Sequence, residues 1–292
     1  MTVNYLDPDE FKKYLDDHSH IAKMQSASDF HGEVTNFFHG KTVDVGDGMP
    51  FGSMTQMFKF RPGEVSIWTG FSGHGKSLLL GQVMSKFMLQ DKKKVAIASM
   101  EMKPVTTLNR MVRQYFESSK PSVEELDGWF AALGDVCWIY NHQGVAIPNE
   151  LIAAMKYSAK DLGVNHFVID SLLKCGLPED DLTAQKNFVD QLCSVARDSK
   201  MHIHLVCHAR KAENEMKIPG KHDIRGSAAI SDQVDNVIVV WRNKDEKRPI
   251  GEDAIISIEK QRNGEFEGKT LLSYNQAGQS FNEFGNKQWT PF

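Results

Sequence analysis

The sequence predicts an α/β fold, with a mostly parallel central sheet flanked by helices, and three observations lead to it. Apolar runs of strand length alternate with helix-like segments from about residue 49 onward, and this alternation is typical of parallel βαβ units. A glycine-rich segment at residues 70–77 stands between a strand-like run and a helix-like one. The last two apolar runs are joined through Asn263-Gly264 and Gly268, which favours antiparallel hairpins at the end of the sheet.

The expected elements follow from these patterns in chain order. Strands are expected at residues 64–69, 94–99, 136–140, 165–169, 202–207, 236–241, 254–259 and 270–274. Helices are expected between the earlier strands, at residues 76–89, 105–116, 123–133, 149–161 and 184–199. The expected strands are short apolar runs bounded by turns, and the helix-like segments lie between the earlier runs.

Composition places the chain among ordinary globular proteins of the cytoplasm. Of its 292 residues, 41% are hydrophobic and 25% are charged, enough to bury a sizeable core. The net charge of −4 creates no global field that recruits nucleic acid or anionic membrane, so DNA binding would need a few cations in a confined place. The acidic start does not resemble a signal peptide, and no apolar stretch approaches the ~18 residues of a membrane span.

Residues 1–48 are expected to form an N-terminal linker helix and a tether, apart from the main domain at residues 49–292. An Asp-Pro pair opens the helix-like segment, and Phe11, Tyr14 and Leu15 fall on one of its sides. The stretch that follows has little periodicity. A short helix without a core of its own docks on something else. The sequence leaves open whether it packs on its own domain or on a neighbouring subunit.

The glycine-rich segment fits the phosphate-binding pattern GxxxxGK[ST] and lies between a strand and a helix, as that motif requires. Its glycines let backbone N–H groups face phosphate oxygens, Lys76 can reach the β and γ phosphates, and Ser77 can ligate Mg²⁺. The residues expected to contact the nucleotide are Gly70, Ser72, Gly73, His74, Gly75, Lys76, Ser77 and Leu78. The chain is therefore predicted to be a P-loop NTPase that binds ATP, or another NTP or dNTP, with Mg²⁺.

Two acids stand at the ends of buried-type strands. Asp170 follows three apolar residues and is expected to hold Mg²⁺ through water from a strand neighbouring the P-loop strand. Glu101 ends a second such run, and we expect it beside the P-loop strand, polarising the attacking water. Each has a structural alternative, because Asp170 could cap its strand and Glu101 could stabilise the N-terminus of the next helix.

A third strand-like run ends in His208. A polar residue at that tip could hydrogen-bond the γ-phosphate and sense its loss. A lone histidine is equally compatible with a structural role.

Three further segments carry a family resemblance. Residues 223–235, DIRGSAAISDQVD, strongly resemble the D-[IL]-R-G-S-[GA]-A-[IL] signature of ring-shaped replicative helicases, the family of bacterial DnaB, phage primase–helicases and mitochondrial Twinkle. Residues 258–264, IEKQRNG, resemble the K-x-R-N-G element of DnaB, and residues 99–102, SMEM, resemble its S-L-E-M segment. The resemblance covers residues 50–275. It implies a RecA-like core in a hexameric ring that hydrolyses ATP at subunit interfaces, translocates on single-stranded DNA and unwinds duplex DNA.

The resemblance also implies roles for residues outside the P-loop. Glu101 matches the catalytic glutamate, and His208 matches the phosphate-sensing position, where phage primase–helicases carry His and DnaB carries Gln. Arg262 resembles the arginine finger that reaches the neighbouring subunit's site, with Lys260 beside it. Without the resemblance, both cations would be interpreted as charges that protect an edge strand.

Base and DNA contacts follow from the same comparison. Arg242 and Tyr274 match positions that sandwich the base in phage-type enzymes. The segment from residue 209 to 225 matches the loop that lines the central channel and tracks single-stranded DNA, although its cations alone would indicate a solvated surface loop. The DNA-contacting residues implied are Arg210, Lys211, Lys217, Lys221, Arg225 and Gly226.

The chain departs from the family in one respect, since it has no room for the helical collar of DnaB or the primase of the phage proteins. We therefore expect a stand-alone motor of the bacterial cytoplasm, encoded by a phage, with a separate primase, polymerase or loader. A fragment of a longer protein is the alternative. Two other functions remain open: a RadA-like recombinase ATPase, and a nucleotide-switched oligomeric DNA-binding protein that does not unwind.

Overall fold

The computed structural model describes residues 26–39, 46–210, 215–226 and 229–284. The helix expected around Phe11, Tyr14 and Leu15 lies outside the described residues, as does Lys211. Within the described part of the chain, no helix has both the length and the apolar character needed to cross a membrane.

The described residues build a nine-stranded sheet that confirms the predicted fold class. In sheet order its strands are β11 (Ser280–Glu283), β10 (Gly268–Asn275), β9 (Ala254–Gln261), β8 (Asn236–Arg242), β3 (Val65–Thr69), β7 (His202–Val206), β6 (His166–Asp170), β4 (Val95–Ser99) and β5 (Cys137–Ile139). The six from β8 to β5 run parallel. The pairs β8–β9, β9–β10 and β10–β11 are antiparallel, so the sheet ends in the expected hairpins.

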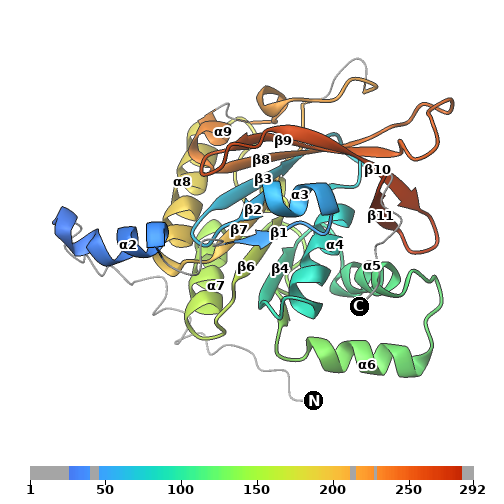
Figure 1. Cartoon of the computed structure of the whole chain (residues 1–292), viewed down its shortest axis with the longest axis horizontal. Coiled ribbons are helices and arrows are strands. Elements are labelled where there is room, and N and C mark those ends of the chain that lie inside the picture. The colour runs from blue at the N-terminus through green and yellow to red at the C-terminus, as the bar shows by residue number, and fades with distance from the viewer. Residues whose placement is uncertain (1–25, 40–45, 211–214, 227–228, 285–292) are drawn as a thin grey trace.

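Helices cover both faces of this sheet (Figure 1). One face packs against α4 (Lys76–Leu89), α5 (Pro104–Phe116) and α6 (Val123–Leu133). The other packs against α7 (Pro148–Lys160), α8 (Leu182–Ser199) and α9 (Ala229–Gln233). Strands β3, β4, β6 and β7 are buried along their whole length, so their residues are mostly apolar, and the polar residues that they contain, such as His202 and His204 of β7, are buried as well.

The expected position of the two acidic strands is wrong. Strand β4, which precedes Glu101, was expected beside the P-loop strand β3, and β6, which carries Asp170, was expected as its neighbour. The partners of β3 are instead β7 and β8, and β6 and β4 lie beyond β7. Each parallel crossover can skip places in the sheet, so proximity in sequence does not fix adjacency.

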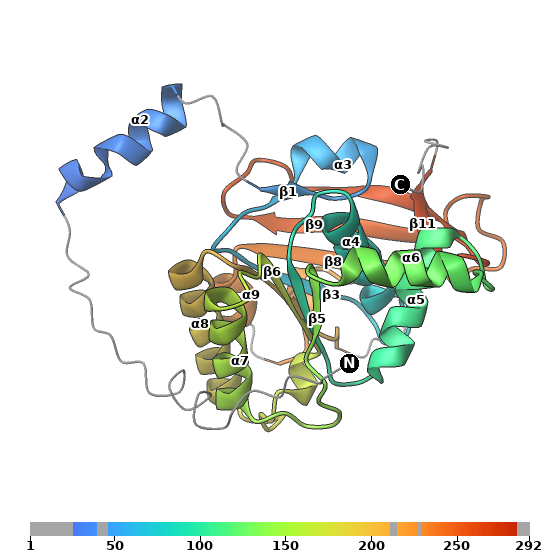
Figure 2. The same ribbon diagram turned by 90° about the horizontal axis from the view of Figure 1, so that it is seen from below.

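The stretch before residue 48 is more regular than expected. A short helix η1 (Ala27–Phe30) leads into α2 (His31–His39), where the sequence was taken to have little periodicity. Helix η1 begins with a capping box. The Ser26 side chain accepts hydrogen bonds from backbone N–H groups, and the Asp29 side chain accepts one from the backbone N–H of Ser26. Figure 2 shows α2 standing clear of the sheet and its helices, and Phe38 is 70% exposed.

Several other short elements were also not expected, and three of them lie together before β3. Strands β1 (Asp47–Gly48) and β2 (Lys59–Phe60) pair antiparallel around α3 (Gly52–Met57). They cover one end of the core through fully buried side chains, among them Met49, Phe51, Met54, Phe58 and Phe60. Elements of two to six residues are too short to show a clear period in a sequence.

A directed chain of buried hydrogen bonds joins β1 to the sheet. The Trp68 indole N–H donates to His204 Nδ1 at 3.2 Å, so His204 Nε2 carries the proton and donates to His166 Nδ1 at 3.1 Å. His166 Nε2–H then donates to Asp47 Oδ2 at 3.0 Å. Burial lowers the pKa of both histidines, which keeps them neutral. Asp47, also paired with Lys93 at 3.1 Å, is the acceptor that ends the chain.

Replacing Asp47 with alanine is expected to lower the free energy of unfolding by about 1–3 kcal/mol, because the buried N–H of His166 loses its acceptor. Denaturant titration measures the change. Asp47→Asn is the matched control, since its amide oxygen can still accept while the charge is removed, and its loss should be clearly smaller. Equal stability of Asp47→Ala and the wild type would refute the role of the chain.

Candidate nucleotide-binding and catalytic site

The P-loop connects the end of β3 to the first turn of α4, as the motif requires. Gly75, with φ of 91°, is the N-cap of α4, so the positive end of the helix dipole faces the loop. Gly70 has φ of 148°, and a Cβ there would stand 2.1 Å from the carbonyl oxygen of Val240. This close approach to β8 excludes a side chain at position 70.

Lys76 is held inside the loop. Its Nζ donates to the carbonyl oxygens of Gly70 and Phe71, both at 2.9 Å. Burial lowers the pKa of Lys76, and the nearby charges of Asp170 and Glu101 oppose that shift. The ammonium is thus positioned between the loop backbone and two carboxylates, where it can bind an anionic phosphate.

Asp170 and Ser77 are the pair suited to Mg²⁺. Their side chains are hydrogen-bonded, and burial raises the pKa of Asp170 despite that bond. A hydroxyl and a carboxylate are hard oxygen ligands, and Mg²⁺ in nucleotide sites uses one or two of these with phosphate oxygens and water. The residues present therefore fit this ion.

Glu101 lies beside His208 and Ser171. Its Oε1 is 3.6 Å from His208 Nε2 and accepts from the Ser171 hydroxyl at 2.5 Å. The contact with His208 is the main cause that lowers the pKa of Glu101 to about 2, against the effect of its burial, and the Ser171 hydrogen bond adds to it. Glu101 is therefore a carboxylate at neutral pH and can accept a proton from water.

One cavity of about 1,050 Å³, open to solvent, unites most of the predicted site residues. Its lining contains Ser72, Gly73, Gly75, Lys76, Ser77, Leu78, Glu101, Asp170, His208, Arg242 and Tyr274. The Arg242 guanidinium lies 6.0 Å from the centre of the Tyr274 ring. The buried side chain of His74 is not part of the lining and points toward Glu215 and Arg242.

The sequence interpretation missed four residues that also line this cavity, namely Met102, Arg110, Val206 and Gln279. Arg110 lies on α5 and its guanidinium donates to the Met102 sulfur at 2.8 Å. A helix arginine nine positions after Glu101 gives no local signal. Only the packing of α5 against α4 brings it to the site.

Lys260 and Arg262 lie at the opposite edge of the sheet. Strand β9 runs antiparallel to β8, so its last residues pair with Asn236 at the start of β8, away from the P-loop edge. Lys260 Nζ and Arg262 Nη2 donate to backbone carbonyls at the end of α9 and just after it, with distances from 2.7 to 3.4 Å. Within one chain these two cations cannot reach the nucleotide cavity.

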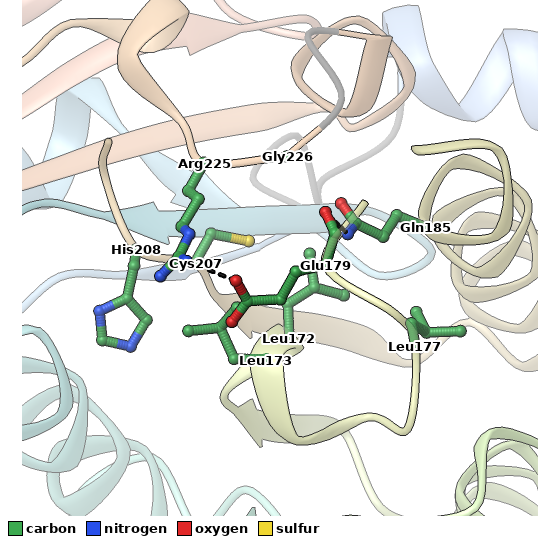
Figure 3. Close-up of a pocket in the computed structure, with 9 residues that line it drawn as sticks. All are labelled: Leu172, Leu173, Leu177, Glu179, Gln185, Cys207, His208, Arg225 and Gly226. Carbon is green, nitrogen blue, oxygen red and sulfur yellow. Dashed lines mark hydrogen bonds and ion pairs between the residues drawn. The ribbon is translucent and has the colours of Figure 1, made fainter. Parts of the chain in front are cut away.

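The cations of the segment between β7 and α9, residues 209–225 and hereafter the β7–α9 loop, are spread along it. Lys217 is exposed, Lys221 begins the short helix η3 (Lys221–Asp223), and the Arg210 guanidinium donates to the Gly226 carbonyl at 3.5 Å. Figure 3 shows Arg225 reaching across a small pocket to Glu179, with Nη2 and Oε2 2.5 Å apart.

The surroundings of Gly226 leave no room for a side chain at this position. It has φ of 109°, and a Cβ there would stand 2.3 Å from Gln185 Oε1 on α8. The same small pocket is also lined by His208 (Figure 3). The end of the β7–α9 loop and the Glu101–His208 pair are therefore adjacent.

The central parallel strands, the P-loop after β3 and the acids at the ends of β4 and β6 define a RecA-like P-loop nucleotide-binding domain. A model of the DnaB-like helicase C terminal domain family matches residues 50–283. The chain belongs to this family.

Relatives agree with the assignment. The chain is 23% identical over 287 residues to a Twinkle homolog protein, chloroplastic/mitochondrial, of Arabidopsis thaliana, covering 90% of this chain and 40% of that one. It is 26% identical over 212 residues to a DNA helicase/primase of Enterobacteria phage T3, and the match covers 65% of this chain and 37% of that protein. The chain thus spans about two fifths of the length of these relatives.

Solved structures share the fold. A DnaB-like replicative helicase, described with its interactions with primase, superposes with a TM-score of 0.71 at 15% identity, over 89% of this chain and 67% of the other. The ATPase domain of G40P superposes with a TM-score of 0.71 at 17% identity, over 88% of this chain and 99% of the other.

Proposed function

We propose that this chain is the motor of an ATP-dependent replicative DNA helicase, a hexameric ring that moves on single-stranded DNA and unwinds duplex DNA. One observation carries the proposal: the cavity gathers the P-loop, Glu101, Asp170 and His208, while Arg262 stays at the opposite edge of the same chain. A site of this kind is complete only when a neighbouring copy supplies the arginine.

Within the cavity, each side chain has a separate task. Lys76 and the backbone N–H groups of the P-loop bind the phosphates, and Ser77 and Asp170 would hold Mg²⁺, which neutralises charge on the phosphate oxygens. The Glu101 carboxylate orients the attacking water and accepts its proton. His208, which contacts Glu101, senses whether the γ-phosphate is present and passes this change to the β7–α9 loop, which follows it in the chain.

The base is proposed to stack between Arg242 and Tyr274, because both side chains line the cavity and the guanidinium lies over the face of the ring. Such contacts involve the ring faces and not base-specific edges. They are compatible with ATP or another NTP or dNTP.

Assembly is proposed to use the N-terminal residues 1–48 as a contact to the neighbouring subunit. The helical segment before the main domain supports this, because Phe30 at the end of η1 and Val34 and Phe38 of α2 are exposed, and apolar side chains grouped on an exposed helix are suited to a partner surface. A separate primase, polymerase or loader is proposed as a further partner.

Single-stranded DNA is proposed to bind the β7–α9 loop, and Glu179 is expected to compete with its phosphates for Arg225. Both side chains are exposed, by 60% and 46%, so the pair is weak and DNA can displace it. Glu179→Gln should tighten binding of oligo-dT by about two- to fivefold, with a steeper salt dependence. Fluorescence anisotropy at several salt concentrations measures both.

Asp180→Asn is the matched control, since it removes the same charge one residue away. If it tightens binding as much as Glu179→Gln, the gain is a general charge effect, and Glu179 does not compete for Arg225.

ATP turnover with and without single-stranded DNA tests the proposed function. Wild-type turnover should rise when DNA is added. Lys76→Ala should reduce turnover by about 100-fold or more, because removing one preorganised contact to the charge that develops in the transition state lowers the rate by that factor. Weak turnover indifferent to DNA would instead indicate a nucleotide-switched binding protein.

A further inference from the structure

His74 belongs to the P-loop, yet its side chain is fully buried and turned away from the cavity. Its Nδ1 accepts from the backbone N–H of Arg242 at 3.0 Å. A backbone N–H can only donate, so Nδ1 is unprotonated and Nε2 carries the hydrogen of the neutral ring. Nε2 therefore donates to Glu215 Oε2, at 3.4 Å. Burial lowers the pKa of His74, which favours this neutral form.

Glu215 lies in the β7–α9 loop and is anchored at two points besides His74. Its carboxylate is 2.7 Å from Lys244 Nζ, and its carbonyl oxygen accepts from the Trp241 indole N–H at 2.8 Å. The described part of the loop thus holds both the P-loop and the end of β8 through a single residue.

Apolar packing reinforces these hydrogen bonds. Phe71 of the P-loop shares a small hydrophobic cluster with Ala209 at the start of the loop and Trp241 of β8. The Phe71 and His74 rings meet edge to face, with centroids 5.3 Å apart. A shift of the loop would therefore disturb the P-loop through both contacts.

We propose that the Glu215–His74 contact is the link through which the β7–α9 loop positions the nucleotide site within one subunit. His74 holds the backbone of Arg242, whose guanidinium lies over Tyr274, so the link reaches both the phosphate and the base contacts. His74 and Glu215 are positioning residues here. The inference rests on the proposed function, in which this loop binds single-stranded DNA.

Linkage makes the proposal measurable. If DNA acts on the nucleotide site through this contact, DNA changes nucleotide affinity by some factor, and nucleotide changes DNA affinity by the same factor. A residue that merely stabilises the fold would alter both affinities without altering that factor.

The experiment measures the Kd of a fluorescent ATP analogue with and without oligo-dT, and the ratio is the coupling factor. Glu215→Ala should reduce this factor by about fivefold or more, the lower range of typical couplings. His74→Asn keeps an acceptor near the Nδ1 position and removes the Nε2 donor, so it should cause the same reduction. The double variant should lose no more than either single one, because both remove one interaction.

Two controls complete the design. Glu246→Ala removes an exposed acid from the neighbouring loop after β8 and should retain the wild-type factor. His74→Gln places an amide donor near the Nε2 position, so it should retain part of the coupling factor that His74→Asn loses.

The outcomes separate this inference from the proposed function. A wild-type coupling factor retained in Glu215→Ala and His74→Asn overturns the inference alone, as does an additive loss in the double variant. A wild type whose nucleotide affinity and turnover ignore DNA overturns the proposed function and the inference with it.

Discussion

Replacing Arg262 with alanine is expected to lower ATP turnover of the assembled protein by about 10³-fold or more, the usual contribution of an arginine finger. The reason is positional. Arg262 follows β9 at the sheet edge away from the P-loop, and its side chain is 46% exposed. It can serve a nucleotide only in a neighbouring copy.

A mixture of two inactive variants tests this directly. In an equal mixture of Arg262→Ala and Glu101→Gln chains, about a quarter of the interfaces combine an intact Glu101 pocket with an intact Arg262 from the neighbour. Turnover should therefore reappear on mixing. A mixture that stays inactive would show that Arg262 does not act in trans.

Arg262 also supports its own chain, which requires a separate control. Its guanidinium donates to carbonyls at the end of α9 and pairs with Asp235 at 3.5 Å. Its removal should therefore lower the free energy of unfolding as well, and denaturant unfolding of the variant measures this loss of stability. Recovery of activity on mixing cannot arise from a loss of stability, so the two effects are distinguishable.

The second large effect is expected for Glu101→Gln, which should reduce turnover by about 10²–10⁴-fold. The amide keeps the shape of the side chain and can still meet Ser171 and His208, but it cannot accept the proton of the attacking water. Single-turnover hydrolysis measures the loss.

Nucleotide binding provides the control for that variant. A fluorescent ATP analogue should still bind Glu101→Gln, because Lys76 and the P-loop backbone are unchanged. Retained hydrolysis would mean that Glu101 acts only as the helix-terminal acid that the sequence also allowed.

The sequence was sufficient for the main strands and helices and for many of the side chains that line the cavity. Parallel strands buried on both faces are visible as uninterrupted apolar runs, and β3, β6 and β7 have the predicted positions to within one residue at each end. Acids and histidines that follow such runs gather at one sheet edge in any parallel sheet. Glu101, Asp170 and His208 could therefore be predicted to meet without knowing the strand order.

What the sequence did not reveal depends on long-range packing. The order of β7, β6 and β4 beside β3 is decided by crossovers, and the cavity position of Arg110 by the packing of α5. By contrast, the helical segment of η1 and α2 had signals in the sequence: the Ser26–Asp29 capping box marks its start, and Phe30, Val34 and Phe38 recur every four residues.

The cations of the β7–α9 loop illustrate the same limit. The sequence lists their charges but not their partners. Arg225 is paired with Glu179 from another loop, and Glu215, a residue that the sequence did not single out, contacts the P-loop through His74.

Unwinding of a forked DNA by the full chain with ATP and Mg²⁺ tests the central claim most directly. We expect the wild type to separate the strands and both Lys76→Ala and Arg262→Ala to leave them paired. Robust DNA-stimulated ATP hydrolysis without strand separation, on forks with either tail free, would contradict a helicase and favour a recombinase-like or switch function.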